Sequence, residues 1–156
     1  MEGRYLMDTM LNGLTPSQRR KLPPADVFNG NCPSRELVDI LSGKWATLLL
    51  WSLAREPMRF GELRRRLEGV TQKMLTQTLR TLERNGLVSR TVYATTPPSV
   101  EYALTPLGVS VSGISEQMCQ WAQVHIKDVI VARQGYDKAA LRPDGVSIVT
   151  GGKRQS

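Results

Sequence analysis

The side chains best suited to reading nucleic-acid bases lie on one side of the segment 71–86, TQKMLTQTLRTLERNG. Its leucines recur at helical spacing and predict a buried stripe formed by Leu75, Leu79 and Leu82, with Met74 beside them. The opposite side carries amides, hydroxyls and cations: Gln72, Lys73, Thr76, Gln77 and Arg80. In the major groove, arginine or lysine pairs with guanine and glutamine pairs with adenine. We therefore predict that these five residues contact bases, although a merely solvated helix face could carry similar side chains.

Positive charge is concentrated around this segment. The chain has a net charge of +7 and a pI near 9.8. Residues 59–90 hold eight Lys/Arg against three Glu, whereas the rest of the chain holds 13 basic and 11 acidic residues. Such clustering favours a polyanionic partner. We expect contacts to the DNA backbone, or through a wing, from Arg59, Arg64, Arg65, Arg66, Arg84, Arg90, Thr91, Tyr93, Thr95 and Thr96.

The three consecutive arginines and the wing residues each have an alternative explanation that does not involve DNA. At most two of the three consecutive arginines 64–66 can face one DNA strand, which leaves the third solvated or paired with Glu62 or Glu68. The residues after Arg90 could equally belong to an ordinary hairpin with a stiff Pro-Pro tip.

Cys32 and Cys119 are candidate sensor thiols. Cys32 precedes Pro33, so it would cap a helix whose N–H groups and dipole favour a thiolate, with Arg35 adding to the effect. The alternative is an inert capping or packing cysteine. Cys119 could form an intersubunit disulfide with Cys32 of a second copy, provided that the two Cα atoms approach to within about 7 Å.

The elements that must position these residues follow a recognisable order. Residues 59–69 and 71–86 predict two helices, the first ending at Gly69 and the second running from the capping Thr71 to Gly86. Segments 87–93 and 99–105 alternate like half-buried strands around the tip ATTPP. Helix, turn, helix, strand, wing and strand form a winged helix-turn-helix, a mainly α fold with a small β-wing, whose second helix enters the major groove.

Further helices flank this unit. We expect helices at about 32–42 and 43–55, and a final helix over 106–133 opened by Thr105 and Pro106. A heptad-like seam on the final helix predicts a dimer interface formed by Leu107, Val111, Ile114, Met118, Trp121 and His125. Gly108 and Gly113 weaken this helix, at about 1 kcal/mol each relative to alanine. The expected organisation is a partly flexible arm at 1–31, one domain at 32–133 and a flexible tail at 134–156.

Four motifs together resemble a known family over roughly residues 32–125. They are Cys32–Pro33, GKW (43–45), RFGELRRRLEGVTQKMLTQTLRTLERNGLVSR (59–90) and PPSVEYALTPLG (97–108). This combination resembles the HxlR-type bacterial regulators, relatives of the MarR group. The resemblance implies a homodimeric transcription factor that binds a palindromic operator, with N- and C-terminal helices at the dimer interface. It also implies that Cys32 occupies the position at which some members sense quinones, aldehydes or oxidants.

The leading interpretation is a dimeric, sequence-specific DNA-binding regulator, a repressor, controlled through Cys32 or through a small effector. Such an effector could lie among Trp45, Trp51, Trp121, Met74 and Met118, although large apolar residues at this spacing more often form plain core. The alternative is a winged-helix protein-interaction module without sequence-specific DNA binding.

Other classes receive no support from the sequence. It has no Ser/His/Asp constellation, phosphate loop or metal-ligand motif, so we predict no enzyme, no cofactor and no metal site. With two cysteines, no signal-peptide pattern and no apolar run of membrane length, we expect a cytoplasmic protein that does not enter membranes.

Overall fold

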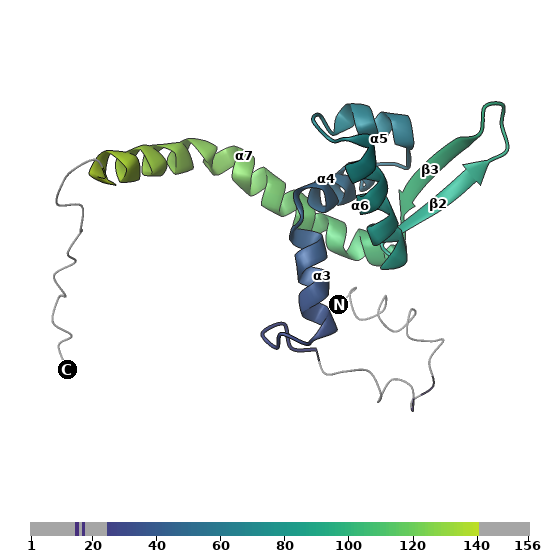
Figure 1. Cartoon of the computed structure of the whole chain (residues 1–156), viewed down its shortest axis with the longest axis horizontal. Helices are drawn as coiled ribbons and strands as arrows, with labels where there is room; N and C mark the ends of the chain where they lie inside the picture. Colours follow the sequence, from purple (N-terminus) through teal and green to yellow (C-terminus); the bar gives the residue numbers. More distant parts are fainter. Residues whose placement is uncertain (1–14, 16, 18–24, 141–156) are drawn as a thin grey trace. The chain divides into compact units, whose positions relative to one another are not determined.

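The computed structural model describes residues 25–140 together with Thr15 and Ser17; the predicted arm and tail lie largely outside the described residues (Figure 1). The fold is mostly helical with a small antiparallel sheet, as predicted. The helices are α3 (Pro33–Ser42), α4 (Lys44–Leu53), α5 (Phe60–Arg66), α6 (Gln72–Arg84) and α7 (Pro106–Ala140). The strands are β1 (Met58–Arg59), β2 (Val88–Tyr93) and β3 (Ser99–Leu104).

The turn between α5 and α6 uses the residues that the sequence indicates. Gly69 has a φ of 85°, a conformation that glycine adopts without steric penalty, and it lies two residues beyond the C-cap of α5. The Oγ1 of Thr71 accepts a hydrogen bond of 3.1 Å from the backbone N–H of Met74 and so caps α6. At the other end of α6, Gly86 follows the C-cap with a φ of 71°. These contacts fix the start and the end of the second helix.

The core is built from leucines of three helices. The largest fully buried side chains are Leu49, Leu50, Leu63, Leu75, Leu79 and Leu82. They come from α4, α5 and α6, and α4 packs against α6. Because the whole leucine stripe of α6 is buried in this core, the polar side of the helix is directed outward.

The sheet has the order β1–β3–β2, and all pairs are antiparallel. Tyr102 on β3 lies between Met58 on β1 and Arg90 on β2, because it is the register partner of both. The sequence analysis missed β1, since a two-residue strand is too short to show alternation. The β2–β3 hairpin is the predicted wing and projects beside α6 (Figure 1).

The start of α7 is tied to the sheet more closely than expected. The Oγ1 of Thr105 accepts from the N–H of Gly108 at 3.0 Å, so Thr105 caps the helix as predicted. A Cβ atom at position 108 would lie 2.0 Å from the carbonyl oxygen of Leu87. Gly108 therefore does more than weaken the helix, because its missing side chain allows α7 to approach the start of β2.

The expected end of the final helix at 133 is wrong, because α7 continues to Ala140. Gly135 does not stop it, and the residues around that glycine include good helix formers such as Lys138 and Ala139. Residues 134–140 are thus helical and do not belong to a flexible tail. The chain divides after Cys119 into two compact units, so α7 is shared between them.

Candidate nucleic-acid interface

The polar face of α6 presents the five residues predicted to contact bases. Gln72, Lys73, Gln77 and Arg80 are exposed, and Thr76 is half-buried. Their orientation follows from the helical period, since Leu75, Leu79 and Leu82 occupy the buried side. The result is a continuous row of amide, hydroxyl and cationic groups on one side of a capped helix.

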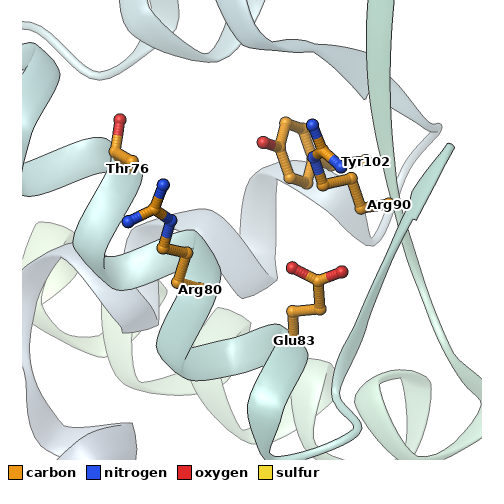
Figure 2. A pocket seen from close by; sticks show the side chains of 5 residues that line it. All are labelled: Thr76, Arg80, Glu83, Arg90 and Tyr102. Atoms are coloured by element: carbon orange, nitrogen blue, oxygen red, sulfur yellow. The ribbon is translucent and has the colours of Figure 1, made fainter. Parts of the chain in front are cut away.

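A cleft lies between the second half of α6 and the sheet (Figure 2). We call it the α6–wing cleft; it has a volume of about 320 Å³ and is lined by Thr76, Arg80, Glu83, Arg90 and Tyr102. Arg90 lies two residues after the buried Val88, so both are on the inner face of β2, and Arg90 is directed toward α6. The cleft thus brings together Arg80 and Arg90, for which the sequence predicted separate roles.

Glu83 and Tyr102 are the cleft residues that the sequence analysis missed. Tyr102 is only 8% exposed, and its place in an alternating strand pattern indicates a core residue. The sequence pattern of α6 places Glu83 on the solvated surface of that helix. The alternation of β2 was the available signal, because it places Arg90, and therefore its cross-strand partner Tyr102, on the face toward α6.

The arginines on α5 differ in their surroundings. Arg64, Arg65 and Arg66 are all exposed. The Nε of Arg66 donates a hydrogen bond of 3.1 Å to the Oγ of Ser52, which ties this side chain to α4. The carboxylate of Glu62 accepts from the backbone N–H of Arg59 at 2.6 Å and so serves the N-terminus of α5. Arg64 and Arg65 are therefore the better placed of the three to face a DNA strand.

The remaining backbone and wing candidates are also exposed: Arg59, Arg84, Thr91, Tyr93, Thr95 and Thr96. Two of their hydroxyls serve the hairpin itself. The hydroxyl of Tyr93 donates to Oε1 of Glu101 at 3.2 Å, and this hydrogen bond, with the nearby carboxylate charge, raises the pKa of Tyr93. The Oγ1 of Thr95 donates to the carbonyl of Pro97 at 2.8 Å. These contacts stiffen the wing and leave Thr91 and Thr96 as its outward hydroxyls.

Cys32 is the N-cap residue of α3, as predicted, and its side chain is 8% exposed. Its Sγ lies 2.9 Å from the Oγ of Ser34 and accepts from the backbone N–H of Asp26 at 3.2 Å. Hydrogen bonds from the hydroxyl and the N–H of Ser34, then from the N–H of Asp26, lower the pKa of Cys32. Hydrogen-bond donors, and not Arg35, therefore account for the stabilised thiolate.

Cys119 has the opposite character. It is half-buried on α7, and burial raises its pKa. The two candidate thiols are therefore not equivalent, and Cys32 is the one whose surroundings favour the reactive anion.

The predicted seam on α7 divides into two sets. Ile114 is 66% exposed and Trp121 is 59% exposed, and Leu107 and Met118 are exposed as well. The ring of His125 stacks on that of Trp121 with centroids 4.6 Å apart. Val111, in contrast, packs against the core of its own chain. The heptad spacing could not separate Val111 from the others, because α7 presents apolar residues on more than one side.

Two of the aromatic residues proposed to enclose an effector, Trp45 and Trp51, line different hollows. Trp45 and Met74 line a hollow of about 320 Å³ that also includes Ile40 and Gln77. Trp51 lines a different hollow of about 270 Å³ with Leu48 and Arg66. Trp45 also packs against the core, in agreement with the structural alternative for this residue.

Comparison with known proteins places the chain in a family. The family model of the HxlR-like helix-turn-helix matches residues 40–130, which is more than half of the chain. The protein belongs to the HxlR family. It is therefore a transcriptional regulator with a DNA-binding helix-turn-helix, a class of protein that is not enzymatic.

Individual known proteins resemble the chain over most of their own length. The HTH-type transcriptional regulator YtfH of Escherichia coli K12 is 38% identical over 117 residues, covering 75% of this chain and 93% of YtfH. The structure of the transcriptional regulator ytfH from Salmonella typhimurium matches with 38% identity and a TM-score of 0.68, covering 71% of this chain and 99% of that one. The structure of the redox regulator HypR in its oxidized form matches with 41% identity and a TM-score of 0.56. The match covers 60% of this chain and 96% of HypR.

Within the part of the chain that the structure describes, each helix is too short or too polar to span a membrane. The same residues contain no group of three or more His, Cys, Asp or Glu side chains placed to hold a metal ion.

Proposed function

We propose that this HxlR-family regulator is a cytoplasmic homodimer that recognises a palindromic operator and represses transcription by blocking polymerase. The observation that carries the proposal is the division of α6, whose leucine stripe is buried while Gln72, Lys73, Gln77 and Arg80 are exposed. A capped helix with this outward face has the chemistry needed to read base edges in the major groove. The exposed arginines of α5 supply phosphate contacts that hold the helix in register.

The homodimer is supported by the apolar side chains that α7 exposes. Large apolar side chains exposed in such number along one helix are typical of an interaction site. The exposed set is Leu107, Val109, Ile114, Met118, Trp121, Val124, Ile126, Ile130, Val131 and Tyr136. A second copy of α7 offers a matching apolar surface, and two-fold symmetry of the dimer would mirror a palindromic site.

Control by thiol chemistry is supported by the hydrogen bonds to Cys32. A thiolate stabilised by Ser34 and by the N–H of Asp26 reacts faster with electrophiles and oxidants than an ordinary buried thiol. The neighbour HypR is described as a redox regulator and was solved in oxidized and reduced forms. In our proposal, modification of Cys32, or a disulfide from Cys32 to Cys119 of a second copy, alters the half-site spacing and releases the operator.

The decisive test is selection of DNA. Purified protein is incubated with fragmented DNA from its source at about 150 mM salt, and the retained fragments are sequenced. An enriched inverted repeat with half-sites about one helical turn apart, lost in the Gln77→Ala/Arg80→Ala variant, supports the dimeric regulator. The Arg55→Ala variant is the matched control, since Arg55 is exposed but lies outside α5, α6 and the wing. Retention without a shared sequence would favour the protein-interaction module instead.

The disulfide has a separate test. The protein is treated with diamide and analysed by non-reducing gel electrophoresis. We expect a dimer-sized band that disappears in both Cys32→Ser and Cys119→Ser. If the protein instead runs as a monomer-sized band that Cys119→Ser leaves unchanged, the intersubunit disulfide is refuted. Control by modification of Cys32 alone would remain compatible with that result.

A further inference from the structure

The α6–wing cleft contains a buried tyrosine, Tyr102, whose hydroxyl has no hydrogen-bond partner among the residues that the structure describes. Tyr102 is 8% exposed, and its hydroxyl makes no hydrogen bond to any residue that the structure describes. That oxygen is also not among the fully enclosed polar atoms that lack a partner, so it is accessible from the cleft. In Figure 2 the hydroxyl is directed into the space between the strands and α6, on the side of Thr76 and Arg80. A donor held in this way is available to a ligand.

Thr76 is distinguished from the other threonines of α6 in the same manner. The hydroxyls of Thr78 and Thr81 donate to carbonyls one turn earlier, at 2.8 and 3.0 Å. The hydroxyl of Thr76 makes no such bond among the described residues and lines the cleft. With the guanidinium groups of Arg80 and Arg90, the cleft therefore collects donors from three elements, α6, β2 and β3 (Figure 2).

Glu83 limits what this cleft can bind. Its carboxylate faces the cleft from the α6 side, below Arg90 in Figure 2. Two guanidinium charges and one carboxylate leave the cleft with a net charge of +1. A site with this charge suits a singly charged oxyanion such as a phosphodiester, and it is weakly suited to a free phosphate dianion.

We propose that the α6–wing cleft binds one phosphate group of the DNA backbone, held by Arg80, Arg90 and the hydroxyl of Tyr102. Arginine and tyrosine side chains are common donors to phosphate oxygens, and such contacts fix the register of a protein on the duplex. In this arrangement Arg80 positions α6 and does not read a base, and the wing is locked to the recognition helix through one phosphate. The proposal rests on the proposed function, since that function supplies the DNA.

The test combines a protein change with a change in the DNA. Tyr102→Phe keeps the ring in the core and removes the hydroxyl, and Ser110→Ala, which removes an exposed hydroxyl on α7, is the control. Operator DNA is synthesised with a single neutral methylphosphonate at each backbone position in turn. We expect wild type to lose affinity at several positions per half-site, including one held in the cleft, where the loss should be about tenfold, as for a hydrogen bond to a charged group. Tyr102→Phe should bind unmodified operator about tenfold more weakly, and it should show little further loss at that position.

The outcomes separate the cleft from the proposed function. If Tyr102→Phe folds with the thermal midpoint of wild type and keeps both its affinity and its methylphosphonate profile, the cleft proposal is overturned and the operator-binding function stands. If wild type selects no operator, the proposed function fails, and the cleft is titrated with dimethyl phosphate, a singly charged phosphodiester, while the arginine Nε–H resonances are followed by NMR. A saturable shift at Arg80 and Arg90 that Tyr102→Phe abolishes would assign the phosphate site to a free oxyanion. No shift in that titration would overturn the phosphate site as well.

Discussion

The helices α6 and α7 differ in which kind of side chain they bury and which kind they expose. α6 buries its large leucines at 75, 79 and 82 in the core of its own chain and exposes polar groups. α7 buries Gly108, Ser112 and Ser115 and exposes large apolar residues such as Ile114 and Trp121. The inversion shows which surface each helix offers. α6 packs its apolar side within one chain and presents outward the polar side that we propose contacts DNA. α7 instead leaves exposed the apolar area whose burial normally drives association.

The buried side of α7 is formed by small residues, which leaves its large apolar side chains exposed. Because a Cβ at position 108 would lie 2.0 Å from the Leu87 carbonyl oxygen, only glycine allows this approach. The Oγ of Ser112 donates to the carbonyl of Val109 at 3.0 Å and so satisfies a buried hydroxyl. Gly108 thus allows the start of α7 to lie close to Leu87, and small residues occupy the buried side of the helix while larger ones are exposed.

The largest expected effect comes from placing charge on the exposed apolar side of α7. Ile114→Glu/Met118→Glu should shift the protein from dimer to monomer, because each carboxylate would be buried without a partner, at about 3–5 kcal/mol. Gln117→Glu, an exposed polar position on the same helix, should leave the dimer intact. Analytical ultracentrifugation at several concentrations measures the dissociation constant. An unchanged constant in the double variant would show that this side of α7 does not associate.

The next effect tests the inner side of α7. Gly108→Ala should lower the free energy of unfolding by about 2 kcal/mol, because backbone must move to admit the methyl group. Gly113→Ala has no heavy atom within 4 Å of its new Cβ, and it should raise the stability by about 0.5–1 kcal/mol through helix propensity. Urea denaturation at one fixed protein concentration compares the two. Equal effects of both substitutions would refute the close-packing role of Gly108.

Two substitutions on α6 distinguish a residue that contacts bases from a residue that contacts the DNA backbone. Gln77→Ala should cost about 1–3 kcal/mol for the preferred operator and relax the preference at one base pair. Arg80→Ala should weaken binding uniformly across sequences and reduce the salt dependence, as expected for a phosphate contact. Binding to a set of operator variants at two salt concentrations distinguishes these patterns. If Arg80→Ala relaxes the preference at a guanine instead, Arg80 contacts a base.

The smallest expected effect concerns the two thiols. The pKa of Cys32 is lowered by its hydrogen bonds and that of Cys119 is raised by burial, so the alkylation rate of Cys32 should reach its half-maximum at a lower pH. Ser34→Ala removes the main donor to the thiolate, so the pKa of Cys32 should rise and its rate at neutral pH should fall. Iodoacetamide labelling of single-cysteine proteins across a pH series measures both. A Cys32 profile that Ser34→Ala does not move would contradict the assigned cause.

Much of the fold could be predicted because its signals are local. The stop at Gly86, the cap at Thr71 and the leucine period of α6 each depend on residues within one or two turns of each other. The α6–wing cleft could not be predicted as a unit, since Glu83 and Tyr102 are far apart in the sequence and neither has an unusual local pattern. β1 escaped prediction because two residues show no period.

The sequence alone therefore predicts five helices and the two wing strands, the caps at Thr71 and Thr105, and the division of α6 into an apolar and a polar side. Those properties follow from backbone propensity and from the periodicity of apolar side chains, both of which depend on residues close together in the sequence. Only the tertiary structure decided that Val111 packs inward while Ile114 is exposed, that Gly108 is a contact and not a weakness, and that Arg80, Arg90 and Tyr102 share one cleft. Each of these depends on which segments come within contact distance, and a periodic pattern carries no such information.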